Sequence, residues 1–149
     1  MLTDAILAIL HHLLIFALVV VLTMEIMLTR RDMGAARVLY LSRIDLAYGA
    51  IATAIVVVGI GRVLYGLKGP EYYLVNEFFW AKMAAFVGVG LLSIRPTLVI
   101  QRWRSAARAD PEFRPAGDEV MTVRSFMHTE AMLFTLIPVF AALMARYGS

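Results

Sequence analysis

The chain has 149 residues, of which 61% are hydrophobic and 17% are charged, and its formal net charge is +3. Ordinary soluble domains have an apolar share of about 45–50%, so this composition, with a mean hydropathy of +0.78, excludes them. The sequence contains no cysteine, which excludes disulfides, thiolate metal sites and thiol nucleophiles. Its arginines flank apolar segments, as in membrane proteins, and this distribution argues against nucleic acid as a partner.

The first apolar segment predicts a transmembrane helix over residues 4–28, because it exceeds the roughly 20 residues that cross a bilayer. It differs from a secretory signal, since no Lys or Arg precedes it and Asp4 stands where a positive region belongs. We therefore expect this helix to be retained. The polar sequence Thr29-Arg30-Arg31-Asp32 ends it.

A second helix is predicted over residues 44–67, and it ends at Lys68-Gly69-Pro70, where glycine followed by proline cannot continue it. Small residues in a membrane helix let neighbouring backbones approach closely. The interior of this helix carries such residues at Gly49, Ala50, Ala54, Gly59 and Gly61. The aromatic and acidic segment 71–77 predicts a turn or short helix at the membrane interface.

The third helix is predicted over residues 78–100, with a kink expected at Pro96. The polar residues 101–119 predict a solvated loop, which includes Arg102, Trp103 and Arg104. A fourth helix is predicted over residues 125–145, interrupted only at Pro138. No strand pattern or internal repeat is found, so the sequence predicts an all-α integral membrane protein with one domain over residues 1–149, folded as an up-down bundle of four transmembrane helices.

The orientation follows from the basic residues in the connections, since basic loops remain in the cytoplasm. The connections after the first and third helices share one side of the membrane. They contain or adjoin ten arginines: Arg30, Arg31, Arg37, Arg43, Arg95, Arg102, Arg104, Arg108, Arg114 and Arg124. The opposite side carries mainly Lys68 and Arg146, with Arg62 and Lys82 at helix ends. We therefore expect both termini to lie outside the cytoplasm.

Ionisable residues at membrane depth are costly, which makes them functional candidates. Those of the predicted outer half are His11, His12, Arg62 and Lys82, surrounded by Tyr65, Tyr72, Tyr73 and Trp80. Those of the predicted inner half are Glu25, Asp45, Arg95, Arg124, His128 and Glu130. The balanced charges of the inner layer favour pairing with each other and with lipid headgroups; a proton path is the alternative.

Helical geometry distinguishes the two histidines. Glu25 follows His11 by fourteen positions, and at about 100° per residue the two return to within roughly 40° of one face. If Glu25 faces the bundle interior, His11 faces it too, and His12 points elsewhere. The histidines are either polar groups bonded between helices or, beside Arg62 and Lys82, part of a ligand site.

Several motifs cover the whole chain: His11-His12-Leu13-Leu14, Glu25, Arg43-x-Asp45, Gly61-Arg62, Phe78-Phe79-Trp80-Ala81-Lys82 and Leu91-Leu92-Ser93-Ile94-Arg95-Pro96-Thr97. With these motifs the chain resembles the bacterial membrane family called domain of unknown function 2214. More remotely it is similar to the copper-resistance D proteins and to the haem-dependent protoporphyrinogen oxidase. The oxidase resemblance implies haem binding through His12 and a role for Lys82, although the oxidase pattern of aromatic residues and histidines in the third helix is incomplete here. The family resemblance implies the inner membrane of a bacterium, crossed several times.

The leading hypothesis is a small membrane protein that binds haem b or a related tetrapyrrole in its outer half, for electron transfer or haem metabolism. His11 and His12 are the candidate metal ligands, Arg62 and Lys82 supply charge for the propionates, and Trp80 lies beside them. The alternative is a non-catalytic accessory subunit that packs in the lipid bilayer against other membrane subunits or against copies of itself. A transporter of a small anion or metal is a third possibility, and whether the chain is an enzyme stays open.

Overall fold

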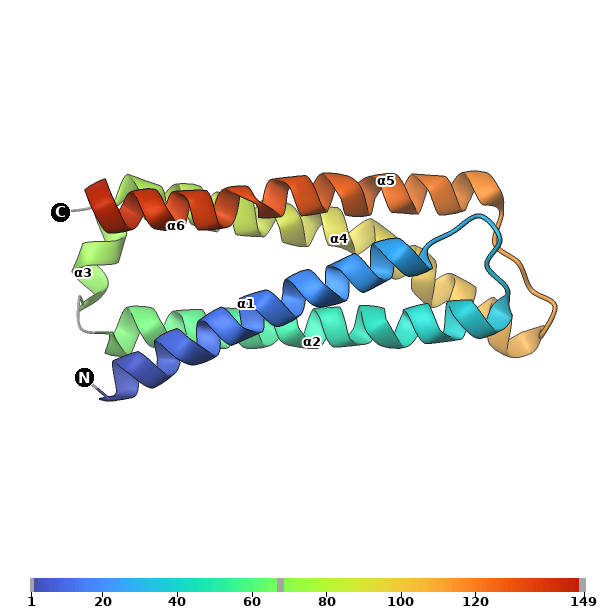
Figure 1. Ribbon diagram of the computed structural model, residues 1–149, viewed down its shortest axis with the longest axis horizontal. Helices are drawn as coiled ribbons and strands as arrows, with labels where there is room; N and C mark the ends of the chain where they lie inside the picture. Colours follow the sequence, from blue (N-terminus) through green and yellow to red (C-terminus); the bar gives the residue numbers. More distant parts are fainter. Residues whose placement is uncertain (1, 67–68, 148–149) are drawn as a thin grey trace.

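The computed structural model describes residues 2–66 and 69–147, and in these residues every regular element is a helix. In chain order the helices are α1 (Leu2–Leu28), α2 (Ala35–Tyr65), α3 (Gly69–Leu74), α4 (Glu77–Ala109), α5 (Gly117–Phe134) and α6 (Leu136–Tyr147). Figure 1 shows α1, α2, α4 and the nearly collinear pair α5 and α6 as four long rods. The up-down helical bundle is therefore confirmed.

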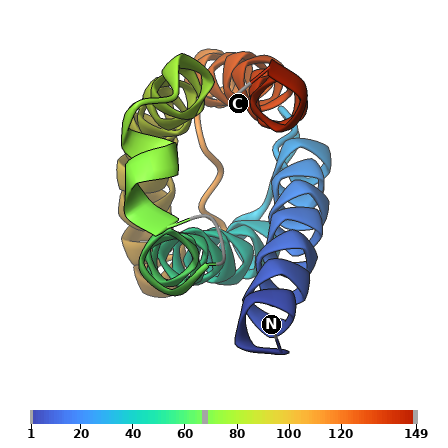
Figure 2. The same ribbon diagram turned by 90° about the vertical axis from the view of Figure 1, so that its left-hand side faces the viewer.

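Each of the four rods is long and apolar enough to cross a membrane. The start of α1, the end of α6 and the short helix α3 lie at one end of the bundle, which we call the α3 end (Figure 1). The connections 29–34 and 110–116 lie at the opposite end, called here the connection end. Seen from the α3 end, the rods form a ring in which α1 packs against α2, α2 against α4, and α4 against α5 and α6 (Figure 2).

The second helix begins at Ala35, nine residues before the predicted start at 44. Its added turns are amphipathic: Val38 and Leu41 are buried in the core, whereas Arg37 and Arg43 are exposed. A period of three to four residues places the apolar side chains on one face of the helix. The arginines on the other face make the segment polar on average, which is why the sequence predicted a loop here. At the other end α2 stops at Tyr65; the predicted last residue, Leu67, and the stop residue Lys68 lie outside the described residues.

The predicted loop over residues 101–119 is too long: α4 continues to Ala109 and α5 begins at Gly117, so only residues 110–116 form the connection. Ile100, Trp103 and Ala107 recur at helical spacing and are all buried. Their burial stabilises about two and a half further turns, while the arginines of this segment lie on the other faces. Pro96 is inside α4 and buried, and the helix runs through it.

The fourth span begins at Gly117, eight residues before the predicted 125, with Asp118 and Glu119 in its first turn, where acidic groups favour a helix N-terminus. It is divided at Thr135, between α5 and α6. Pro138 explains the division: it has no N–H to donate, and its ring clashes with the carbonyl four residues earlier, at Phe134. The predicted interruption of the fourth span is thus confirmed, and the break in the helix lies at Thr135, about one turn before Pro138.

The buried residues form two clusters. One lies at the connection end and includes Met33, Val38, Leu41, Ile100, Trp103, Val120, Val123 and Met127. The other lies in the middle of the bundle and includes Leu18, Leu22, Tyr48, Ile55, Ala85, Val89, Phe134 and Ile137. The outward faces carry many exposed Leu, Ile and Val side chains, as expected for helices surrounded by lipid.

Candidate ligand-binding cavity

A cavity of about 580 Å³ lies inside the ring of helices toward the α3 end. All six helices contribute to its wall, and α5 supplies only Phe134 at its end. The wall is mostly apolar, with Ile15, Ile55, Val63, Phe86 and Ile137 among its residues. Pockets that bind small molecules and cofactors measure about 300–1,000 Å³ and share this apolar character.

Four of the five predicted site residues line this cavity. His11 comes from α1, Arg62 from the last turn of α2, and Trp80 and Lys82 from the beginning of α4. The sequence placed these residues at similar depth in the membrane, and in the structure they line the same cavity. The cavity thus combines one imidazole and two cationic groups with apolar and aromatic walls.

His11 lines this cavity and has a ring nitrogen without a hydrogen-bond partner among the described residues. This nitrogen, Nδ1, is buried. The ring lies against Gly59 of α2, where an added β-carbon would be 3.5 Å from Cε1 of His11. Because buried polar nitrogens normally have a partner, the side chain is in a position that suits a bound ligand.

His12 does not line the cavity. Its side chain is exposed, and its Nδ1 lies 2.6 Å from the carbonyl oxygen of Ala8. A carbonyl only accepts, so Nδ1 carries the hydrogen and donates it. One residue step turns a helix by about 100°, which directs His12 away from His11. The helical-face argument for His11 is therefore confirmed, and the role that the remote resemblance implied for His12 does not fit this cavity.

The cationic groups of the cavity are not neutralised by the protein residues that the structure describes. Arg62 has a buried Nε without a hydrogen-bond partner, and neither Arg62 nor Lys82 forms a salt bridge with a described carboxylate. Glu71 and Glu77, the two acids of the segment 71–77, do not take part in the salt bridges of the described residues. Lys82 instead places Nζ 5.3 Å from the centre of the Phe79 ring, a cation–π contact.

Helix α3 lies at the end of the cavity, where Leu74 contributes to the wall. The predicted interfacial turn is thus a short helix, which begins at Gly69 with φ of 71°, a value that favours glycine. Trp80 ties this helix to α4, since its Nε1 donates to the carbonyl of Leu74 at 2.9 Å. The Tyr72 hydroxyl donates to the carbonyl of Met144 on α6 at 3.2 Å. These bonds fix the position of α3.

The donor set fits a tetrapyrrole better than a bare metal ion. In the described residues no group of three or more His, Asp or Glu side chains is arranged to hold a metal. The iron of a haem requires only one or two protein ligands, and its propionates require cations. His11, with its free nitrogen, and the unneutralised Arg62 and Lys82 meet these requirements. Met83 also lines the cavity.

The second predicted layer of charges is arranged differently from expectation. Glu25, Asp45 and Glu130 are buried together in the bundle, but the expected pairing with the basic residues is absent among the described residues. Arg124 donates from Nη1 to the carbonyl of Thr29 at 2.9 Å, and Arg95 lies 4.9 Å from the centre of the Phe126 ring. Asp45 and Glu130 accept from neutral donors instead, which helical spacing within single helices could not reveal.

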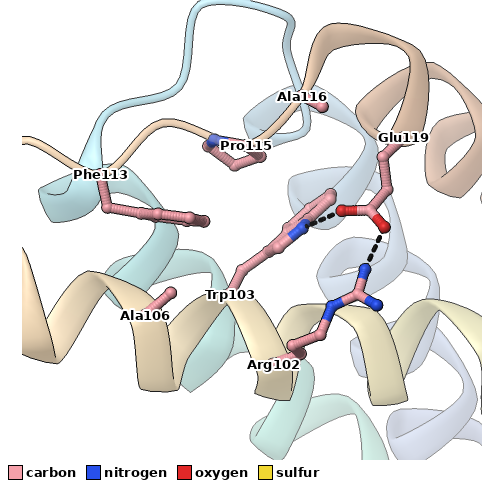
Figure 3. A pocket seen from close by; sticks show the side chains of 7 residues that line it. All are labelled: Arg102, Trp103, Ala106, Phe113, Pro115, Ala116 and Glu119. Carbon is pink, nitrogen blue, oxygen red and sulfur yellow. Dashed lines mark hydrogen bonds and ion pairs between the residues drawn. The ribbon is translucent and has the colours of Figure 1, made fainter.

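A smaller hollow of about 260 Å³ lies at the connection end. Figure 3 shows the Glu119 carboxylate between Trp103 and Arg102, with Phe113 and Pro115 on the opposite side. Trp103 donates from Nε1 to Glu119 at 2.6 Å, and Arg102 donates to the other oxygen. This contact joins α4 to the start of α5 and holds the connection between them.

Fold and cavity together define a small integral membrane protein of four spans, with a mostly apolar cavity near one end that carries one imidazole and two cationic groups. The chain belongs to the family described as "Predicted membrane protein (DUF2214)", whose model matches residues 3–148. The family resemblance seen in the sequence motifs is thereby confirmed. No curated protein and no solved structure matches the chain.

Proposed function

We propose that this protein binds haem b or a related tetrapyrrole in the cavity, and that it serves electron transfer or haem metabolism. The observation that supports the proposal is the coincidence of unpartnered groups: Nδ1 of His11 and Nε of Arg62 are both buried without a partner and both residues line one cavity. A neutral apolar ligand would leave them unsatisfied. An anionic ligand that carries a metal satisfies both.

Each lining residue has a role in this proposal. His11 would hold the iron of such a group, and Met83 is a second candidate donor in the wall. Arg62, in the last turn of α2, and Lys82 would bind the propionates. Trp80, Phe86 and the aliphatic residues exclude water from the remaining surface. Bound haem supplies one-electron redox chemistry.

Purification in a mild detergent, followed by titration with haemin, tests this proposal. We expect a Soret band that is lost in His11→Ala. The matched control is His12→Ala, which removes the same side chain from the neighbouring exposed position and should keep the band. Neutralisation of either cation by Arg62→Gln or Lys82→Gln removes a charge-assisted bond of about 1.5–3 kcal/mol, so haemin affinity should fall by at least about tenfold.

A wild-type protein that is colourless and binds no added haemin would refute the proposal. Loss of the band in His12→Ala but not in His11→Ala would show that the cavity is not the binding site. Co-purification of the colourless protein with other membrane chains would then favour the accessory-subunit hypothesis.

A further inference from the structure

A second polar site lies in the bundle, separate from the cavity. Glu25 of α1, Asp45 of α2 and Glu130 of α5 have exposed fractions of only 3%, 5% and 2%. On α1 the buried residues Leu18 and Leu22 lie between Glu25 and the cavity residue His11. The three carboxyls therefore lie on the connection side of an apolar layer and do not contribute to the cavity wall.

The three acids differ in their hydrogen bonds. Asp45 accepts at both oxygens, from the Thr97 hydroxyl at 2.7 Å and from the Gln101 amide at 3.2 Å. Glu130 accepts from the buried Tyr48 hydroxyl. Glu25 has a buried Oε1 that finds no partner among the described residues. Among the three acids, Glu25 therefore has the fewest hydrogen-bond donors from the described residues.

No described cation compensates these acids. On α5, Arg124 donates to the backbone carbonyl of Thr29, and His128 is exposed with Nδ1 2.8 Å from the carbonyl of Arg124. On α4, Arg95 is exposed and lies over Phe126. On α2, Arg43 is exposed. Tyr48, Asp45 and Glu130 are thus the titratable groups that face Glu25 inside the bundle, and none of them supplies positive charge.

We propose that Glu25, Asp45, Glu130 and Tyr48 form a proton-binding site within the membrane-spanning bundle, and that Glu25 is the carboxyl that holds the proton. A buried carboxylate without a donor or a cation is strongly disfavoured, and protonation removes its charge. Asp45, with two neutral donors, is the acid best able to remain ionised. The Tyr48 hydroxyl can both donate and accept, so it extends the site from α2 to Glu130.

This proposal does not depend on haem. It requires only that the bundle is folded, so loss of haemin binding leaves it untouched. It also predicts that the amide in Glu25→Gln is accepted, since a neutral acid and an amide have nearly the same shape and neither carries a charge.

Infrared spectroscopy of the full chain in phosphatidylcholine vesicles tests the proposal directly, because the carbonyl stretch of a protonated carboxyl is separate from the bands of a carboxylate. We expect this acid band in the wild type at neutral pH, and its loss in Glu25→Gln. Glu112→Gln, at an exposed position of the 110–116 connection, is the control that should keep the band. A wild type without the band at neutral pH, or a band of unchanged area in Glu25→Gln, overturns the proposal.

Labelling with dicyclohexylcarbodiimide identifies the residue without any substitution. The apolar reagent adds to a protonated carboxyl and rearranges to a stable N-acylurea, so acid and reagent combine without a leaving group. Mass spectrometry of the peptides should find the adduct on Glu25 at neutral pH and less of it as the pH rises. An acid band that appears only after chelation and dialysis would show that a metal cation, not a proton, is the native ligand, and would refute the proposal.

Discussion

The imidazole of His11 on α1 packs against Gly59 on α2, at a distance where an added β-carbon would lie 3.5 Å from Cε1 of the ring. Because Gly59 has no side chain, the space beside the imidazole stays open and belongs to the cavity. Both residues line it. The stripe of small residues on α2, read from the sequence as a packing surface, therefore also has a local role in leaving room for a ligand.

Substitution at Gly59 should separate these two roles. We expect Gly59→Leu to abolish haemin binding, because its side chain fills the space beside His11, and Gly59→Ala to keep it, because 3.5 Å is an ordinary contact distance. Gly49→Leu adds the same volume to the same helix where no atom lies within 4 Å, and it is the matched control. Haemin titration followed at the Soret band measures all three. Equal binding in both leucine variants would contradict the placement of the ligand.

Asn76 should stabilise the start of α4. Its side-chain oxygen accepts from the backbone N–H of Phe78 at 3.0 Å and of Phe79 at 3.3 Å, and the residue is buried. Loss of such a cap costs about 1 kcal/mol, so Asn76→Ala should lower the unfolding midpoint in detergent. Asn76→Ser keeps an acceptor and should restore most of the loss. A midpoint unchanged in Asn76→Ala would show that the cap contributes nothing.

The sequence predicted the parts of this fold that depend on properties of one helix. Four spans follow from hydropathy, and the inward position of His11 follows from its angular relation to Glu25. The amphipathic ends of α2 and α4 were missed because their arginines lower the mean hydropathy, although buried residues such as Val38 and Trp103 recur at helical spacing. Periodicity, weighed above hydropathy, could have identified them.

Contacts between helices could not be predicted in the same way. The bond from Tyr48 to Glu130 joins residues 82 positions apart, and that from Thr97 to Asp45 joins residues 52 positions apart. Such partners depend on how each helix is rotated about its axis and on its shift along the bundle. Charge balance within the layer therefore predicted ion pairs, whereas the packing gives Asp45 and Glu130 neutral donors.

The contact between α4 and α5 should depend more on Trp103 than on Arg102. The Trp103 side chain is only 2% exposed, and its N–H would lose its acceptor in Glu119→Ala, which costs about 1–3 kcal/mol. Arg102→Gln removes an exposed ion pair with Glu119 and should cost about 1 kcal/mol at most. Glu119→Gln retains an acceptor and should fall between them. Unfolding in a denaturing detergent ranks the variants, and the reverse order would contradict this account.

The orientation in the membrane is the remaining prediction. Arg31 and Arg114 lie in the connections 29–34 and 110–116, both at the connection end (Figure 1). Because basic connections stay in the cytoplasm, alkaline phosphatase fused after either residue should be inactive, and green fluorescent protein at the same junctions should fluoresce. A phosphatase fused after Val75, beside α3, is the matched control and should be active in the periplasm. Phosphatase activity after Arg31 and Arg114, with none after Val75, would invert the orientation and place the His11 cavity in the cytoplasmic half.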